Sequence, residues 1–255
     1  MRYLALFASL LVLFAGGCSR TDAQGPAAIP AESVRSDISP DIALTFTDYD
    51  VAYVQTQMRG WTVVVNRRLL ESQSTMTRRA LALLDRKLAD IERTVYRFPL
   101  RRLQRVPIWM EGGENGARGL AFHPSEQWLR ENGHNPAKAQ AVEIHNTRDF
   151  LLWEREQPWV VMHELAHAYH HRSLGDDNED IRSAFENARR SGSYDNVRYH
   201  DGSMRRAYAM NDHKEYFAEI TEAYFGTNDF YPFNRAELER HDPQGFALME
   251  RIWRR

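Results

Sequence analysis

The stretch "VVMHELAHAYHH" places His163 and His167 four residues apart, with Glu164 directly after the first histidine. On a helix, residues four apart leave the same face, so both imidazoles can bind one metal ion. Zn²⁺ is the ion typical of this spacing, held at about 2.0–2.1 Å by each imidazole nitrogen. Zinc lowers the pKa of a bound water to about 7, and a glutamate beside it can accept the proton. The alternative is a helix that carries histidines by chance, but the apolar residues around the motif predict a dry, close-packed site.

A catalytic zinc ion usually has three protein ligands and one position for water, so a third ligand has to come from elsewhere in the chain. The metzincin pattern requires glycine at 170 and histidine at 173. This chain has His170 and Ser173, which excludes that class. We expect His170 and His171 to be surface residues near the helix end, where a cation suits the helix dipole.

The better source of a third ligand is a second predicted helix, "DHKEYFAEITEAYF". Glu215, Glu219 and Glu222 lie on one face of this helix. The other positions are largely apolar, so part of the glutamate face has to be buried, and a buried carboxylate needs a charged partner or a metal. One carboxylate can then reach the metal while another supports a ligand. An acidic surface stripe is the alternative.

The succession of "HELAH", Tyr208 and "EYFAE" resembles the catalytic domain of the anthrax lethal factor type of zinc metallopeptidase, within the gluzincin class. The resemblance covers roughly residues 100 to 226. It implies a zincin-like fold, Glu215 as third zinc ligand, Glu219 as acceptor of the second N–H of a ligand histidine, and Tyr208 as a donor to the oxyanion. The thermolysin branch would have asparagine and aspartate where this chain has Lys214 and Glu219. Nothing in the resemblance fixes the substrate.

Tyr208 could instead be a tyrosine packed in the core. Other candidates for the oxyanion donor lie near it in the sequence: Tyr199, His200 and His213.

The strand "QAVEIHN" just before the motif helix is a candidate for the sheet-edge strand that pairs with an extended peptide substrate. His145, in this strand, and His123 could line a cleft. Structural histidines with satisfied hydrogen bonds are the alternative.

The sequence pattern predicts strands in the first part of the chain and helices in the later part, which indicates an α+β domain. A small mixed sheet should accompany the motif helix, which Pro158 opens and which packs on the glutamate-bearing helix. The other elements follow from apolar spacing and turn residues. We predict strands at 50–58, 61–70, 106–111 and 139–146, and helices at 75–98 (ended by Pro99), 124–132, 179–190 and 212–225, then two short helices split before Pro243.

The N-terminal "MRYLALFASLLVLFAGGCSR" has an early charge, Arg2, an apolar run up to Phe14, and small residues before Cys18. This pattern is typical of a secretory signal, and the run is too short to span a bilayer comfortably. As the only cysteine, Cys18 cannot form an internal disulfide. The residues from Ala15 to Cys18 resemble the lipobox of bacterial lipoproteins. That resemblance implies cleavage before Cys18, lipid on it and, with Ser19 following, an outer-membrane location facing the periplasm. Ordinary signal cleavage nearby is the alternative.

The chain is therefore expected to comprise a signal peptide (1–17), a lipid-anchored flexible tether (18–45) and a zincin-like metallopeptidase domain (46–255). A formal net charge of -2 over 255 residues gives no indication of nucleic-acid binding. The expected partners are a peptide or protein substrate and, through Cys18, a membrane of the bacterial cell envelope.

Two functions remain open at this point. The first is a zinc-dependent peptidase, most simply an endopeptidase, with Glu164 as general base. The second is a non-catalytic zinc-containing domain that binds peptide or envelope polymer. Glu164 discriminates between them, because a domain that only binds has no need of a general base.

Overall fold

A computed structural model of the chain describes residues 43–113 and 116–254. The predicted signal peptide, the lipidation site at Cys18 and most of the tether lie outside the described residues. Within the described ranges, no helix is long and apolar enough to cross a bilayer.

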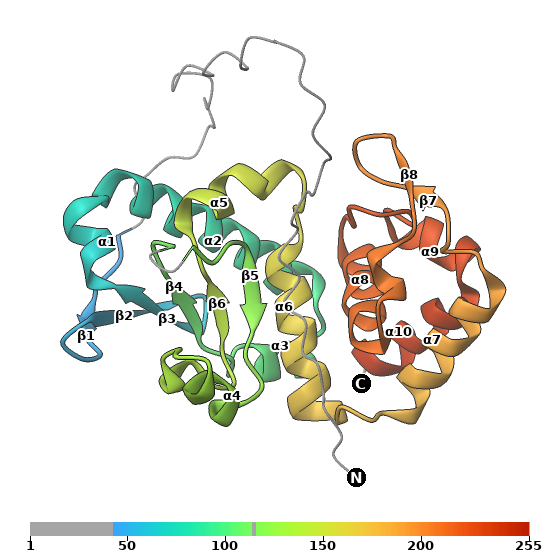
Figure 1. The fold of residues 1–255 in the computed structure, drawn as a ribbon, viewed down its shortest axis with the longest axis horizontal. Coiled ribbons are helices and arrows are strands. Elements are labelled where there is room, and N and C mark those ends of the chain that lie inside the picture. The colour runs from blue at the N-terminus through green and yellow to red at the C-terminus, as the bar shows by residue number, and fades with distance from the viewer. Residues whose placement is uncertain (1–42, 114–115, 255) are drawn as a thin grey trace, which may run out of the picture. The chain divides into compact units, whose positions relative to one another are not determined.

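Six strands in the first part of the described chain form one mixed sheet (Figure 1). Strands β3, β4 and β6 run parallel, whereas β1, β2 and β5 are antiparallel to their neighbours. In spatial order the strands are β1 (Thr47–Asp48), β2 (Tyr53–Met58), β3 (Trp61–Asn66), β4 (Ile108–Met110), β6 (Val142–Ile144) and β5 (Leu120–Phe122). The predicted α+β class with a mixed sheet is therefore confirmed.

The hairpin between β2 and β3 turns through Arg59 and Gly60, both with positive φ. A two-residue turn of this handedness matches the twist of the paired strands, and glycine adopts it without steric cost. The two strands predicted on either side of this turn are present, but residues 67–70, predicted as the end of the second strand, belong to the helix Arg67–Ser72.

Ten α-helices occur in the described residues, most of them after the sheet. They are α1 (Arg67–Ser72), α2 (Ser74–Thr94), α3 (Arg97–Leu103), α4 (Glu126–Glu131), α5 (Thr147–Leu152), α6 (Val160–Tyr169), α7 (Glu179–Ser191), α8 (His213–Phe225), α9 (Arg235–His241) and α10 (Pro243–Trp253). A short hairpin of β7 (Val197–Arg198) and β8 (Met204–Arg205) lies between α7 and α8.

Two helix boundaries that were predicted from prolines, the end at Pro99 and the start at Pro158, are wrong. Pro99 does not end the long helix: α2 ends at Thr94, and Pro99 lies in the first turn of α3. The N–H that proline lacks has no partner inside a first helical turn, so Pro99 is tolerated there. Pro158 lies two residues before the first residue of α6, and Trp159 is the N-cap.

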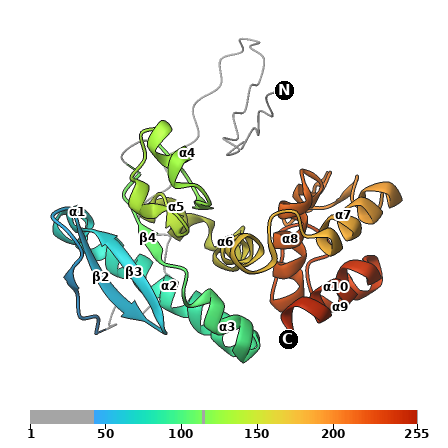
Figure 2. The same cartoon turned by 90° about the horizontal axis from the view of Figure 1, so that it is seen from below.

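The main core lies between one face of the sheet and helices that include α2 and α6. The apolar positions that predicted the long helix are all buried: Ala80, Leu83, Leu84, Leu88, Ile91 and Val95. From β3, the side chains of Val63 and Val65 enter the same core. Helix α6 thus has the sheet on one side and α8 on the other (Figure 2).

The predicted edge strand is not at the edge. Strand β6 is internal, with β4 on one side and β5 on the other, and β5 ends the sheet. The segment "LAFHP" has no long alternating pattern, so its three-residue strand was not predicted from the sequence.

His170 is not a surface residue, contrary to expectation. It follows α6 in a π-helical turn, His170–Leu174, and only 1% of it is exposed. Its ring packs against His213 and Phe217, and within the described structure neither ring nitrogen has a hydrogen-bond partner. Burial and the neighbouring His213 lower the pKa of His170 to about 3. His171 is half-buried and contacts Asp176.

The lowered pKa of His170 should make the folded state sensitive to acid. Below the unfolded pKa of about 6.5 the unfolded chain binds a proton that the folded chain does not, so stability is fully present above that pH and falls below it. Between pH 7.5 and pH 5 this group should remove about 2 kcal/mol from the free energy of unfolding. In His170→Phe that loss should be absent.

Urea unfolding of both proteins at the two pH values measures the difference. The comparison with wild type cancels the contributions of other groups. Equal pH dependence in wild type and variant would contradict the assignment to His170.

Candidate metal centre

The three predicted ligands lie together between α6 and α8. His163 Nε2 is 3.0 Å and His167 Nε2 is 3.2 Å from the same carboxylate oxygen, Glu215 Oε2. Ligand atoms of a tetrahedral zinc site with bonds of 2.0–2.1 Å lie about 3.3 Å apart. Both histidines thus lie at the spacing of zinc ligands from Glu215, and the ligand atoms of all three residues lie within 4.8 Å of one another.

Local sequence explains how these side chains are presented. The side chain of Asp212 caps α8 by accepting from the backbone N–H groups of Lys214 and Glu215, which places Glu215 in the first turn. A carboxylate is favourable there because of the helix dipole. The helices α6 and α8 pack directly on each other.

The residue that supports His163 is Glu222 and not Glu219. His163 Nδ1 lies 2.7 Å from Glu222 Oε1 but 3.9 Å from Glu219 Oε1. Residues seven apart on a helix differ by only about 20° around the axis, whereas residues four apart differ by about 40°. The imidazole of His163 therefore spans from Glu215 to Glu222. Glu219 instead accepts a hydrogen bond from Asn228 Nδ2 at 3.1 Å.

Negative charge is in excess around His163. Burial acts to lower the pKa of His163, but hydrogen bonds with Glu215 and Glu222 raise it well above its usual value. Burial raises the pKa of Glu222 to about 7. Burial, with repulsion from Asp229 and Glu222, raises the pKa of Glu219 well above its usual value. Buried carboxylates in this number need cations, which protons supply without a metal and a divalent ion supplies with one.

The carboxylate of Glu215 itself stays ionised. Burial acts to raise its pKa, but attraction to His167 and hydrogen bonds with both imidazoles lower it far more. An ionised carboxylate between two imidazoles is a donor set that suits zinc.

Glu164 is held by the edge of the sheet. Its Oε2 accepts a hydrogen bond of 2.8 Å from the backbone N–H of Phe122 in β5. This bond fixes the position of Oε2 and does not involve the second carboxylate oxygen, Oε1. The sequence motif could not indicate this contact, because it involves the main chain of a residue 42 positions away.

The outer edge of β5 presents backbone groups on the side away from β6. Gly119, Ala121 and His123 pair with β6, so the backbone groups of Leu120 and Phe122 point the other way. Within the described chain no strand pairs with this edge. The N–H and C=O of Leu120 and the C=O of Phe122 are thus oriented to pair with an extended chain.

Tyr208 reaches the predicted ligands. It opens a 3-10 turn, Tyr208–Met210, just before α8, and its hydroxyl donates to Glu215 Oε1 at 3.5 Å. Burial and the adjacent Glu215 raise the pKa of Tyr208, so the hydroxyl keeps its proton at neutral pH.

The rivals to Tyr208 are engaged elsewhere. Tyr199 packs its ring on His200 and Phe230, and burial raises its pKa to about 12. His213 Nε2 donates to the backbone carbonyl of Asp176 at 2.8 Å.

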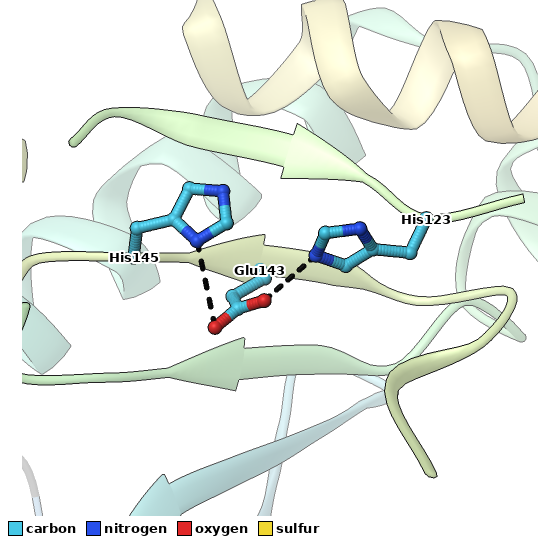
Figure 3. Close-up of side chains that lie close together, drawn as sticks. All are labelled: His123, Glu143 and His145. Carbon is cyan, nitrogen blue, oxygen red and sulfur yellow. Dashed lines mark hydrogen bonds and ion pairs between the residues drawn. The ribbon is translucent and has the colours of Figure 1, made fainter. Parts of the chain in front are cut away.

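His123 and His145 do not join this centre. Both lie against Glu143 of β6 (Figure 3). The neighbours of Glu143, Val142 and Ile144, point into the main core, so this cluster lies on the opposite face of the sheet.

Comparison of the chain with protein-family models, with curated proteins and with solved structures found no match. The site combines two imidazoles and one ionised carboxylate at ligand spacing, the carboxylate of Glu164 on the same helix as the imidazoles, and the phenol of Tyr208 within reach of Glu215.

The partner of His163 can be tested by comparing two equally buried glutamates. Glu222→Ala should weaken zinc binding about 10- to 100-fold, the usual effect of removing a group that orients a ligand histidine. Glu219→Ala, which removes no hydrogen bond to His163, should have a smaller effect. Glu215→Ala should abolish binding at this site.

Competition titrations with a zinc chelator give the three dissociation constants. If Glu219→Ala weakens binding more than Glu222→Ala does, the assignment of the supporting carboxylate is reversed.

Proposed function

We propose that the protein is a zinc-dependent peptidase. The observation that carries the proposal is the convergence of His163 Nε2 and His167 Nε2 on one oxygen of Glu215, at the edge length of a tetrahedral zinc site. Glu164, next to His163 on α6, supplies the additional carboxylate that hydrolysis needs.

His163, His167 and Glu215 would hold the ion. When bound, zinc supplies an acidified water and charge for a developing oxyanion. Glu164 accepts the proton of the attacking water and passes it to the leaving amine. Tyr208 donates its hydroxyl proton in a hydrogen bond to the oxyanion, a contact of a kind worth about 3 kcal/mol to the transition state.

An extended peptide is the substrate class that the edge of β5 favours. The outward N–H and C=O of Leu120 and the C=O of Phe122 allow a peptide to add as a strand, with main-chain hydrogen bonds that do not depend on its side chains. The same strand holds Glu164, so binding along β5 would bring a peptide carbonyl beside the general base.

The zincin-like fold and the cell-envelope location belong to the same proposal. The helix pair α6 and α8, with a mixed sheet ending in β5, supports the resemblance to gluzincins of the lethal factor type. Attachment through lipid at Cys18 would place the enzyme at the membrane surface, facing the periplasm.

Glu164→Gln tests the reaction. The amide cannot act as a base, so hydrolysis should fall by about 10²- to 10⁴-fold while zinc content stays unchanged. A peptide-library digestion with mass-spectrometric readout measures cleavage, and elemental analysis measures zinc.

The exposed Glu131→Gln is the matched control and should cleave like wild type. If the zinc-loaded wild type cleaves no peptide of a broad library, the protein is the non-catalytic zinc domain instead.

Tyr208→Phe tests the oxyanion donor. Removing the hydroxyl should lower kcat about 10²- to 10³-fold with little change in KM or zinc affinity. Tyr199→Phe should leave kcat unchanged. A Tyr208→Phe enzyme that keeps the wild-type kcat would leave this tyrosine with a packing role only.

A further inference from the structure

A second cluster of side chains of the types that can bind metals is formed by Glu143 in β6 and by His123 and His145, which directly follow β5 and β6. Glu143 points away from the main core, to which its neighbours Val142 and Ile144 belong. His123 Nε2 is 2.7 Å from Glu143 Oε2, and His145 Nδ1 is 3.5 Å from Glu143 Oε1. The two rings approach the carboxylate from its two sides (Figure 3).

The polar groups of this cluster are buried and depend on one another for partners. Lys138 Nζ lies 2.6 Å from both Glu111 Oε1 and Glu143 Oε1. One ammonium thus faces two carboxylates. His123, Lys138 and Glu143 are all buried, so a cation bound between Glu143 and the two histidines would add to the neutralisation of these carboxylates.

We propose that His123, Glu143 and His145 bind a second divalent transition-metal ion of the zinc class. Their ligand atoms all lie within 4.8 Å of one another. Because ligand atoms in a tetrahedral zinc site are about 3.3 Å apart, these atoms would have to approach one another by up to about 1.5 Å to close around an ion. Two imidazoles and a carboxylate form a donor set that suits zinc better than magnesium or calcium.

Lys138 contacts one of the two oxygens of Glu143. That oxygen, Oε1, also faces His145, whereas Oε2, which faces His123, lies outside this ion pair. The positive charge of Lys138 is shared with Glu111, which in turn accepts hydrogen bonds from Tyr53 and Asn66. Such contacts fix the orientation of a ligating carboxylate, as outer contacts do in metal sites generally.

The second ion would fasten the edge strand to the sheet. Strand β5 has three residues and β6 as its one neighbour in the sheet. His123 directly follows Phe122, whose N–H holds Glu164. An ion shared by His123 on one strand and by Glu143 and His145 on the next would therefore keep Phe122 in register with α6. The site is structural, and it does not depend on whether the centre between α6 and α8 binds zinc.

Zinc stoichiometry distinguishes the two sites. The full chain is loaded with zinc chloride, freed of excess by gel filtration, and assayed for zinc per chain by elemental analysis. Wild type should hold two equivalents. His167→Ala and His145→Ala should each hold one, and the double variant none. His134→Ala is the control, because that histidine lies beside His123 but outside the ligand set, and it should keep two.

A wild type that holds one equivalent, lost in His167→Ala and kept in His145→Ala, overturns the second site and leaves the proposed peptidase site intact. The reverse pattern, one equivalent lost only in His145→Ala, supports the second site and removes the proposed peptidase site. Loss of an equivalent in His134→Ala overturns the ligand assignment.

Thermal unfolding gives an independent readout if zinc counts are disturbed by poor folding. In the His167→Ala background, added zinc should raise Tm, because an ion that binds only the folded chain stabilises it. Adding His145→Ala should abolish that rise. A rise of the same size in the double variant overturns the proposal.

Discussion

Negative charge buried between α6 and α8 is the constraint on which the site depends. Glu219 and Glu222 are buried, the side chain of Glu215 is 21% exposed, and His163 contacts both Glu215 and Glu222. The amide of Asn228 cannot offset three carboxylates so close together, so protons or a metal ion must balance their charge. The geometry that holds protons in the absence of metal is also the geometry of a zinc ligand set.

Strand β5 connects this helix pair to the sheet. Its main chain pairs with β6 on one side and holds Glu164 on the other. The two His–Glu clusters therefore share one short strand: the first reaches it through Glu164, and the second includes His123 at its end. Any displacement of β5 would therefore move Glu164 at the first cluster and His123 in the second.

The sequence predicted the parts of the site that depend on periodicity. The spacing of His163 and His167 and the position of Glu215 on a second helix depend only on 3.6 residues per turn. The choice between Glu219 and Glu222 depends on how far α8 is rotated against α6, which spacing does not specify. The edge strand was missed because "LAF" contains no β-branched residue, whereas the equally short β4 and β6 contain Ile108, Val142 and Ile144. His170 was misplaced because the chain continues past α6 in a π-helical turn that turns this residue inward.

The contact between Phe122 and Glu164 has a consequence for how such a site can vary. The donor is a main-chain N–H, which every residue except proline carries. The residue at position 122 can therefore change to any type except proline without loss of the hydrogen bond to Glu164, as long as β5 stays in position. Part of what orients Glu164 is thus the position of the backbone, which a comparison of side chains between sequences would not reveal.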